Sequence, residues 1–550
     1  MSPGPITIAT MNTAGSWDYV IVGAGSAGCL LANRLSADPD VSVLLLEAGG
    51  KDDWHWIHIP VGYLYCIGNP RTDWCYKTVA EAGLNGRVIN YPRGRVLGGS
   101  SSINAMLYLR GQARDYDEWA QLTGDSSWSW QNVLPAFMDI EDHWRGADEK
   151  HGAGGELRIE TPRVQWDIIE AFRNAAIESG IPATEDFNRG DNFGVSRFEV
   201  TQKNGLRWSS ARAFLRPALR RPNLKVVTGA LVKKLRLEGR QVRGVEFFQG
   251  NEECFAAARR ETILSAGAIG SPQILQLSGI GPGALLQQHG IPVVQELPVG
   301  DNLQDHLQLR LAFRVSHALT LNTLLDSWWA KARMGLEYAF KRSGPLTMPP
   351  SQLGAFARSD PGQVTANLEY HIQPISLDRF GQPPHPFPAF TASVCNIRPT
   401  SRGSVRITSN DPRAHPAIAP NYLSTAEDRK VAADAIRLTR RIVNDSAALK
   451  PHAPEEFMPG PQYQSEAELV QAAGQIGTTI FHPVGTCKMG RADDAMAVVD
   501  PQLRVRGIGG LRVMDASVMP GITSGNTNAP TLMIAERGSR MVRAAQRTVQ

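Results

Sequence analysis

The chain has 550 residues, of which 42% are hydrophobic and 20% are charged, enough for two or more structural units with a buried core and an enclosed cavity. Its 57 basic and 53 acidic residues give a net charge of +4 without a long basic run, which argues against nucleic acid as a partner. The six cysteines form no CxxC pair, so their spacing indicates neither a metal site nor a disulfide framework, and we expect reduced thiols in a cytoplasmic protein.

Residues 1–17 are predicted to form a loose tail rather than a targeting segment. The first basic residue is Arg34, so a positively charged leader is missing, and the apolar stretch is too short for a secretory signal. The longest uncharged stretch, from Ser265 to Gln295, is interrupted by glycines and prolines and predicts no membrane span.

The sequence WDYVIVGAGSAGCLLANRLS followed by VSVLLLEAGG predicts a dinucleotide-binding βαβ unit. The apolar run 19–22 predicts a buried strand, and segment 26–35 predicts a helix whose N-terminus faces a phosphate group. Glu47 ends the next apolar run, 19 residues after Gly28, where a carboxylate accepts hydrogen bonds from ribose hydroxyls. The alternative is a glycine-rich turn with a solvated Glu47, which the ordered strand, helix and acidic end make less favoured.

Each glycine of this unit has its own predicted role. Gly23 permits a tight turn, Gly25 lets the backbone approach a pyrophosphate, and Gly28 lets the helix lie close on the sheet. The residues expected at the nucleotide from this unit are Gly23, Gly25, Ser26, Ala27, Gly28, Glu47 and Ala48.

A second glycine cluster lies in PRGRVLGGSSSINAMLYLRG. Gly98 and Gly99 allow the backbone to pass flat against a ligand, because side chains there would block the approach. A helix is predicted to begin near Ser102, with Asn104 in its first turn directed at the same ligand. Taken alone, the same glycines fit a purely structural turn equally well.

The later part of the chain alternates between two kinds of sequence pattern. Residues 221–248 predict short alternating strands, and a buried strand at 262–264 leads into a helix at 271–277. Residues 316–475 are richer in proline and strand-like pieces, which predicts a second domain built mostly on an antiparallel sheet that roofs the first. The last seventy or so residues return to the first sheet, with a strand that ends at Asp515 and a closing helix.

One amphipathic segment, Trp328 to Arg342, combines tryptophans with lysines and arginines. Such a helix can lie on a membrane surface. A helix that covers a cavity and exposes a basic face is the somewhat favoured alternative.

Five motifs occur in the order and composition of a known family. They are GRVLGGSSSINAMLYLRGQARDYD (Gly94–Asp117), GAIGSPQILQLSGIG (Gly267–Gly281), VGDNLQDH (Val299–His306), HPVGTCKMG (His482–Gly490) and GNTNAP (Gly525–Pro530). From Trp17 to Val542, nearly the whole chain resembles the glucose–methanol–choline (GMC) oxidoreductases. Within them it is most similar to bacterial choline dehydrogenase-like enzymes and to medium- or long-chain alcohol dehydrogenases.

The resemblance implies an α/β FAD-binding domain of the Rossmann-like, glutathione-reductase type and an α+β substrate domain with an antiparallel sheet. The FAD-binding domain is expected to be discontinuous, over residues 16–165, 222–315 and 476–545. The substrate-binding domain is expected over residues 166–221 and 316–475.

The resemblance also implies how FAD is held. The Gly98 to Asn104 loop would lie against the isoalloxazine ring, Asp515 with Ala516 would contact the pyrophosphate and ribityl chain, and backbone groups at Val232 would hold the adenine. The set further includes Arg95, Gly99, Ser100, Ala105, Asn526 and Thr527. Ile103 stands where some members carry a histidine bonded to the flavin, so we expect dissociable, non-covalent FAD.

His482 and Asn526 match the catalytic positions of the family. An alcohol loses its O–H proton only to a base, and an imidazole with a pKa of roughly 6 to 7 can accept it, typically contributing about 10²- to 10⁴-fold. Asn526 would donate its amide N–H to the same oxygen and stabilise the developing alkoxide. Hydride would pass to flavin N5 and leave an aldehyde or ketone. A lone histidine is more often a satisfied hydrogen-bonding group, and context alone distinguishes His482.

Three further functions remain open. The same scaffold serves alcohol oxidases that use O2 and hydroxynitrile lyases without net redox chemistry, and a nicotinamide-dependent dehydrogenase is a poorly supported third. A dehydrogenase with a non-oxygen acceptor is favoured. A quinone could dock at residues 328–342, with the protein cytoplasmic or peripheral at the inner face of a membrane. No interface pattern indicates an oligomeric state.

The substrate pocket is expected to draw on the second domain and to include Tyr63, Phe340, Tyr370 and Phe481. A quaternary ammonium substrate would need an aromatic cage with a carboxylate, whereas an alkyl or aryl alcohol would need apolar walls. With 7% aromatic residues, the composition favours the alkyl or aryl alcohol.

Overall fold

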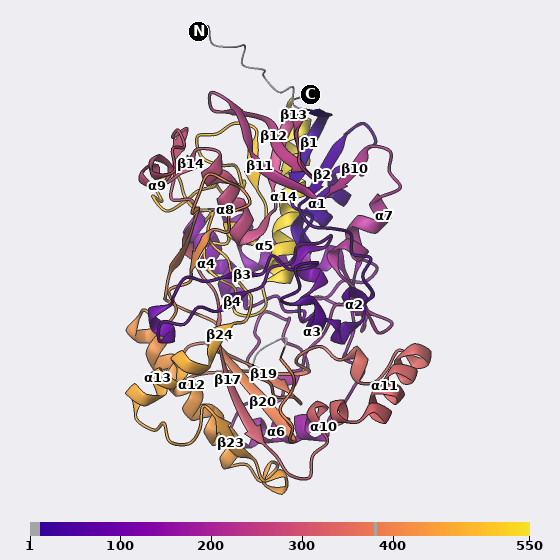
Figure 1. The fold of residues 1–550 in the computed structure, drawn as a ribbon, viewed down its shortest axis with the longest axis vertical. Helices are drawn as coiled ribbons and strands as arrows, with labels where there is room; N and C mark the ends of the chain where they lie inside the picture. Colours follow the sequence, from indigo (N-terminus) through magenta and orange to yellow (C-terminus); the bar gives the residue numbers. More distant parts are fainter. Residues whose placement is uncertain (1–11, 379–381, 550) are drawn as a thin grey trace, which may run out of the picture.

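The computed structural model describes residues 12–378 and 382–549. Two seven-stranded sheets form the framework, one toward each end of the long axis (Figure 1). The expected α/β unit is built on the first sheet, and the expected antiparallel sheet is the second.

The first sheet has the order β10-β2-β1-β13-β12-β11, with β25 also paired to β13. Its strands are β1 (Asn12–Val22), β2 (Val43–Glu47), β10 (Leu224–Thr228), β11 (Ala230–Glu238), β12 (Gln241–Gln249), β13 (Glu252–Leu264) and β25 (Leu511–Val513). Pairs among β10, β2, β1, β13 and β25 are parallel, whereas β12 is antiparallel to both of its neighbours. The strands predicted within 221–264 and the late strand before Asp515 are therefore confirmed.

Helices α1 (Ser26–Leu35), α8 (Gly267–Leu277) and α14 (Asn528–Val549) follow strands of this sheet, and α14 packs against α1. The range predicted for α1 is confirmed, and α8 begins four residues earlier than the predicted start at 271. The predicted tail is wrong over 12–17, because these residues extend β1 along β13, starting at the pair Asn12 and Cys254. The rest of that prediction, 1–11, lies outside the described residues.

The second sheet has the order β23-β17-β20-β19-β18-β7, with β24 also paired to β17, and every pairing is antiparallel. Its strands are β7 (Gly194–Arg197), β17 (Leu307–Arg314), β18 (Leu353–Ala357), β19 (Leu368–Gln373), β20 (Ala389–Asn396), β23 (Glu455–Met458) and β24 (Gly477–Thr479). One face packs on helices α6 (Asp167–Glu178) and α12 (Ala426–Asn444) through side chains such as Leu311, Phe390 and Tyr370. The other face is turned to the first sheet.

Strand β17 shows where sequence and hydrogen bonding divide the chain differently. It falls within 222–315, the range assigned from sequence to the FAD-binding domain, yet it pairs with β20, β23 and β24 of the second sheet. The change from one sheet to the other therefore comes before Leu307. Because a buried strand has the same apolar pattern in either sheet, its register partners alone decide its membership.

The remaining elements connect and cover the two sheets. The helices are α2 (His55–His58), α3 (Tyr63–Cys66), α4 (Ala113–Thr123), α5 (Trp130–Ile140), α7 (Arg216–Ala218), α9 (Gly283–Gln288), α10 (Leu321–Asp326), α11 (Trp328–Lys341) and α13 (Glu466–Ile476). The short helical turns are η1 (Pro60–Gly62), η2 (Ala82–Leu84), η3 (Gly99–Ser102), η4 (Ser126–Trp128), η5 (Ala211–Leu215), η6 (Pro345–Thr347), η7 (Lys450–His452) and η8 (Ala516–Val518). The small strands are β3 (Tyr76–Lys77), β4 (Asn90–Tyr91), β5 (Glu141–His143), β6 (Leu157–Ile159), β8 (Gln202–Lys203), β9 (Leu206–Arg207), β14 (Ile280–Gly281), β15 (Gln295–Glu296), β16 (Asp301–Leu303), β21 (Gly403–Arg406) and β22 (Ala417–Ala419).

The helix predicted to begin near Ser102 is absent from the described chain. A short 3₁₀ turn, η3, ends at Ser102 instead. The hydroxyls of Ser101 and Ser102 donate to the carbonyl oxygens of Gly98 and Leu97. Serine hydroxyls that bind nearby backbone in this way favour a turn over a helix.

The amphipathic segment forms helix α11, which lies at the periphery of the molecule (Figure 1). None of the helices in the described part of the chain has the length and apolar character that a membrane crossing needs.

Candidate active site

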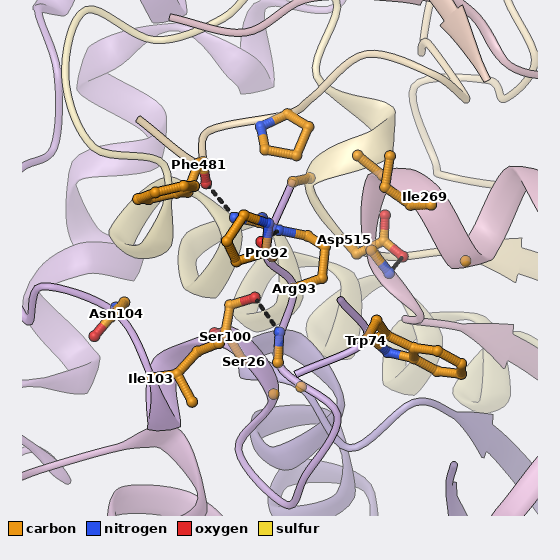
Figure 2. A pocket seen from close by; sticks show the side chains of 18 of the residues that line it. Ser26, Trp74, Pro92, Arg93, Ser100, Ile103, Asn104, Ile269, Phe481 and Asp515 are labelled. Carbon is orange, nitrogen blue, oxygen red and sulfur yellow. Dashed lines mark hydrogen bonds between the residues drawn. The ribbon is translucent and has the colours of Figure 1, made fainter. Parts of the chain in front are cut away.

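A large cavity lies between the first sheet and the second. Its walls include the ends of β1 and β2, the first turns of α1 and α8, and residues of β17 and β19. The side chains around it come from segments far apart in the sequence, among them Trp74, Ser100, Ile269 and Asp515 (Figure 2). The cavity therefore joins the predicted nucleotide edge to the predicted substrate domain.

Two of the three glycines at the first-sheet edge, Gly23 and Gly28, leave no room for a side chain. A Cβ on Gly28 would lie 1.8 Å from the carbonyl oxygen of Gly23, and one on Gly23, whose φ is +97°, would lie 2.6 Å from that of Ser265. A Cβ on Gly25 would meet nothing nearer than 3.9 Å. Gly28 and Gly23 thus serve close packing, while Gly25 leaves its backbone open to the cavity.

The second glycine cluster meets the first backbone to backbone. A Cβ on Gly99 would lie 2.6 Å from Cα of Gly25, so a side chain at Gly99 would separate the two segments. At the start of α8, a Cβ on Gly267 would have no neighbour within 4 Å. Exposed backbone at the N-termini of α1 and α8 suits a dinucleotide with its phosphates, so these residues fit FAD.

The carboxylate of Glu47 lies beside this exposed backbone. Its oxygens accept from the backbone N–H groups of Ala24 at 2.9 Å and Gly49 at 2.8 Å. Burial raises the pKa of Glu47 to about 7, and these two donors partly offset that rise. Glu47 lines the cavity, where it can accept a hydrogen bond from a bound polar group.

Asp515 fixes the start of α8. One of its oxygens accepts from the backbone N–H of Gly267 at 2.9 Å and from the Ser271 hydroxyl at 2.6 Å. The other accepts from the hydroxyl and backbone N–H of Ser517. Burial raises the pKa of Asp515, while its hydrogen bonds oppose that rise. A carboxylate just after β25, as predicted, thus positions backbone that lines the cavity.

His482 lies on the loop after β24 and is held through its backbone. Its N–H donates to Oδ1 of Asp305 at 2.8 Å, and Arg93 donates to the carbonyl oxygen of Phe481 (Figure 2). Phe481 itself has a φ of +73°, a conformation that non-glycine residues rarely adopt. These bonds keep the imidazole in the cavity wall.

Three hydroxyls hold the other oxygen of Asp305. Tyr91, Tyr422 and Thr479 donate to it at 2.8, 2.5 and 2.6 Å. Because a fully buried carboxylate is costly unless hydrogen-bonded, this network keeps the side chain in place, and with it the backbone of His482.

A second imidazole determines which nitrogen of His482 carries the proton. Nε2 of His306 lies 3.2 Å from the carbonyl oxygen of Ile397, an acceptor, so this nitrogen is the protonated one. Burial lowers the pKa of His306 to about 4, so its ring is neutral and Nδ1 is an acceptor. The bond of 3.1 Å between the two Nδ1 atoms is then donated by His482. Nε2 of His482 is left with its lone pair.

That lone pair is directed at Asn526. The amide Nδ2 of Asn526 donates to Nε2 of His482 over 3.0 Å, while its Oδ1 is buried without a hydrogen-bond partner among the described residues. The loop before α14 is fixed by Asp115, which accepts from the backbone N–H and the hydroxyl of Ser524. The unpaired amide oxygen indicates that this part of the cavity binds a polar ligand.

The surroundings keep His482 in its basic, uncharged form. Burial lowers its pKa well below 6.5, and the neighbouring His306, His371 and Arg93 act in the same direction. The imidazole is therefore uncharged at neutral pH, with the lone pair of Nε2 unprotonated.

Most of the predicted site residues meet at this cavity. Those that line it are Gly23, Gly25, Ser26, Ala27, Glu47, Ala48, Gly99, Ser100, Asn104, Ala105, Val232, His482, Asp515, Ala516, Asn526 and Thr527. Gly28, Arg95 and Gly98 do not line it: Gly28 lies within α1 and packs on the backbone of Gly23, the backbone N–H of Gly98 donates to the carbonyl oxygen of Ala24, and Arg95 stacks on Trp74.

The aromatic residues expected around the substrate divide evenly. Tyr63 and Phe481 line the cavity. Phe340 is 84% exposed on α11, and Tyr370 points to the opposite face of the second sheet, where its hydroxyl lies 3.1 Å from that of Thr439. The expectation was wrong for these two, because strand parity and helix face were not fixed by the sequence.

Asp305, His306 and Arg93 were missed as site residues. Asp305 and His306 lie in VGDNLQDH, a motif that the sequence displayed, but nothing in its spacing indicated a contact with His482, 176 residues away. The adjacent aspartate and histidine at the end of this motif were the available signal.

A separate buried cluster consists of Glu141, His143 and His151, whose ligand-type atoms lie within 4.8 Å of one another. Arg110 donates to Glu141 at 2.8 Å, and Asp186 lies 2.8 Å from the His151 ring. Since a guanidinium already supplies the positive charge, this cluster is a hydrogen-bonded network of the core.

Comparisons with known proteins give matches over nearly the whole chain. Residues 17–308 and 399–535 match the sequence descriptions of the two parts of the GMC oxidoreductases. The chain is 41% identical over 531 residues to an alcohol dehydrogenase [acceptor] of Pseudomonas putida, covering 96% of this chain and 95% of the relative. It is 42% identical over 539 residues to oxygen-dependent choline dehydrogenase 1 of Chromohalobacter salexigens, covering 97% and 96%. Among solved structures, pyridoxine 4-oxidase from Mesorbium loti superposes with a TM-score of 0.87 at 35% identity, covering 96% and 99%.

Proposed function

The chain belongs to the GMC oxidoreductase family and is an FAD-dependent oxidoreductase that acts on CH–OH groups, and we propose that His482 is the base of this reaction and Asn526 its hydrogen-bonding partner. The observation that carries the proposal is the unprotonated Nε2 of His482, directed into the cavity 3.0 Å from the Asn526 amide. The tautomer follows from the hydrogen bond of His306 to Ile397.

His482 and Asn526 would act on one oxygen atom. Nε2 of His482 accepts the alcohol proton, and the Asn526 N–H, freed from the imidazole, donates to the oxygen on which negative charge builds. The Nδ1–H of His482 stays bonded to His306, which keeps the ring oriented as it becomes charged. FAD, when bound, supplies the hydride acceptor that turns the alcohol into an aldehyde or ketone.

The first-sheet edge would hold the cofactor. The residues assigned to it are Gly23, Gly25, Ser26, Ala27, Glu47, Ala48, Gly99, Ser100, Asn104, Ala105, Val232, Asp515, Ala516, Asn526 and Thr527. The support is that they line one continuous cavity with backbone exposed at the N-termini of α1 and α8.

FAD would be bound without a covalent link. Ile103 lines the cavity at the position expected for a covalent attachment, and its hydrocarbon side chain offers no nucleophile. Acid precipitation of the purified protein should therefore release the flavin into the supernatant. Flavin retained in the precipitate would contradict this.

The electron acceptor would be something other than oxygen, reached at a membrane surface. On α11, Trp329, Leu336 and Phe340 are 70%, 61% and 84% exposed along one stripe, while Met334 and Tyr338 on the opposite side are buried. Arg333 lies beside the stripe, and Lys331 and Lys341 are exposed elsewhere on the helix, so the segment combines apolar and basic groups as in helices that lie on anionic bilayers.

Flotation with vesicles tests this contact. Wild type should float with anionic vesicles and less with zwitterionic ones, and a Trp329→Ser/Phe340→Ser variant should remain behind. Equal flotation of both proteins would remove α11 as the contact, and with it the support for a cytoplasmic protein peripheral at the inner face of a membrane.

Anaerobic mixing with an alcohol panel tests the function. Bleaching of the visible flavin absorption by an alcohol is expected from a dehydrogenase or oxidase, whereas a hydroxynitrile lyase would leave the colour unchanged. Reoxidation by an artificial quinone should then outpace reoxidation by O2. Protein that stays colourless after FAD reconstitution would favour a nicotinamide enzyme instead.

A further inference from the structure

Three polar residues alternate along β19 on the face of the second sheet that is turned to the cavity. Glu369, His371 and Gln373 share this face because every second residue of a strand points to the same side. His371 and Gln373 line the cavity, together with Gln308 of β17. Their strand neighbour Tyr370 belongs to the hydrophobic core on the other face. The apolar walls expected from the composition are therefore interrupted by polar groups.

Glu369 is a buried carboxylate without hydrogen-bond donors. Its side chain is fully buried, and neither of its oxygens has a hydrogen-bond partner among the described residues. Within the described part of the chain, His371 is the one basic residue at ion-pair distance, with its Nε2 3.2 Å from Oε1 of Glu369. Because a buried carboxylate is costly unless a positive or proton-bearing group faces it, we expect the imidazole to direct a proton toward it.

This carboxylate determines the tautomer of His371. A lone pair on Nε2 would be repelled by the negative oxygen, whereas an Nε2–H is attracted to it, so Nε2 carries the proton and Nδ1 keeps its lone pair. Nε2 is enclosed in the protein, and no described residue hydrogen-bonds Nδ1 of this ring, which lines the cavity. Nδ1 is therefore the nitrogen available to a ligand.

The pair lies close to the candidate base. His371 contributes to the lowered pKa of His482, and the charge of Glu369 opposes the lowering of the pKa of His306. His371 and His482 line the same cavity, so one substrate can contact both imidazoles.

We propose that Glu369 is a positioning residue that makes Nδ1 of His371 a hydrogen-bond acceptor, and that the substrate is an alcohol with a second O–H or N–H donor, which Nδ1 binds. This rests on the proposed function and names the substrate class of the same site. The donor would be the second hydroxyl of a diol or the N–H of a protonated amino alcohol. The quaternary ammonium group of choline has no such donor.

Matched pairs of neutral alcohols test the donor by dye-linked kcat/KM. Ethane-1,2-diol, propane-1,3-diol and butane-1,4-diol are compared with their monomethyl ethers, which keep the second oxygen and lose its hydrogen. At the spacing that reaches His371, the diol should be preferred by about tenfold or more, because the ether leaves a buried acceptor unpaired. Arg93 also lines the cavity, and these uncharged pairs test the donor independently of its charge.

A second pair tests the donor at constant charge. Protonated 2-(dimethylamino)ethanol and choline are both cations, but a methyl group of choline replaces the N–H. The tertiary amine should be preferred by about tenfold or more for the same reason.

Variants of β19 give the matched controls. Glu369→Gln removes the charge at nearly constant size and should abolish both preferences, since a carboxamide can donate as well as accept and no longer fixes the His371 tautomer. Glu369→Asp keeps a carboxylate and should restore much of the preference. Tyr370→Phe, on the opposite face of the same strand, should behave as wild type. A purely structural role of Glu369 would lower the rates of both members of each pair alike.

Melting temperatures of the FAD-loaded proteins give a readout independent of turnover. Propylamine hydrochloride, whose ammonium group has N–H donors, should raise the melting temperature of wild type and not that of Glu369→Gln. Tetramethylammonium chloride has the same charge without a donor and should raise the wild-type value less.

The outcomes separate the two levels of the argument. Ethers oxidised as well as their diols at every spacing, or choline as well as 2-(dimethylamino)ethanol, overturn the donor preference while alcohol oxidation stands. Tetramethylammonium that stabilises as well as propylammonium would make Glu369 a simple counter-charge and overturns the proposal too. Flavin-loaded protein that no alcohol bleaches refutes the proposed function, whereas the melting temperatures still test the acceptor at His371.

Discussion

Two regions of the molecule lie at the same cavity but are built from different parts of the chain. The first-sheet edge contains Gly23, Gly25 and Gly28, and the imidazole wall is formed by His306 and His482. At the edge the protein presents backbone, and a single methyl group at Gly28 would lie 1.8 Å from an oxygen of Gly23. At the wall it presents side chains, with His306 and His482 joined at 3.1 Å. Backbone packing fixes a shape, whereas the hydrogen-bond chain fixes a protonation state, so the two regions should fail in different ways.

Substitution of the edge glycines should have the largest effect and should separate packing from binding. Gly28→Ala forces a backbone clash, so we expect loss of both FAD and stability, by about 3 kcal/mol or more. Gly25→Ala adds a methyl group that points into open space, so the apoprotein should keep its stability within about 0.5 kcal/mol and lose FAD alone.

Flavin content and urea unfolding of the apoproteins measure both effects. Gly50→Ala is the control, because a Cβ there meets nothing within 4 Å and the residue is exposed. Equal stability loss in the Gly25 and Gly28 variants would mean that the edge has no separate binding role.

Loss of the base should have the next largest effect on the enzyme, and it should leave the first-sheet edge intact. His482→Ala should lower kcat by about 10²- to 10⁴-fold because no other group accepts the alcohol proton. Flavin content should be unchanged, since the edge is built from backbone. Steady-state dye reduction checks this, with His289→Ala, which does not line the cavity, expected to retain activity. Activity retained in the His482 variant would remove it as the base.

Acid should weaken the imidazole wall selectively. The folded-state pKa of His306 is about 4 and that of His482 lies well below 6.5, so the unfolded chain binds more protons below pH 6.5. Their contribution to stability is therefore complete above about pH 6.5 and is lost as the pH falls toward about 4, by about 3 kcal/mol for His306 alone.

Urea unfolding at about pH 7 and about pH 4.5 measures this loss, with His306→Asn as the comparison, because asparagine does not titrate there. The wild type should lose more free energy of unfolding than the variant. An equal loss in both would show that the protonation of His306 is not linked to folding.

The smallest predicted effect concerns orientation of the base. His306→Ala removes the acceptor of the His482 Nδ1–H and should lower kcat about tenfold, with a smaller change in KM. His306→Asn supplies a carboxamide oxygen in its place and should restore much of the loss. If His306 served packing alone, the two variants would have the same pH profile of kcat. We expect alanine to alter that profile more than asparagine does.

The sequence predicted the edge well because its signal is local. Residues 19–47 contain a complete strand, turn, helix and second strand, so spacing alone gave Gly23, Gly25, Gly28 and Glu47 their places. The wall was only partly predictable. His482 and Asn526 came from motif resemblance, whereas the contact of His306 with His482 joins segments 176 residues apart.

Two features that the sequence did not reveal have the same origin. Tyr370 was expected in the cavity but faces the core, and the strand at 307–314, which lies in the range expected for the FAD-binding domain, pairs in the second sheet. Strand parity and strand partners are non-local, because a one-residue shift in register sends every side chain of the strand to the other face.

The amino-acid sequence by itself determined the nucleotide-binding unit, the order of the motifs and the residue types available for proton transfer, since these depend on neighbours along the chain. Only the tertiary structure decided which nitrogen of His482 is unprotonated, which carboxylate holds its loop, and which face of β17 and β19 lines the cavity. Those properties arise from hydrogen bonds and desolvation between distant segments, which exist only after the two sheets have closed around the cavity.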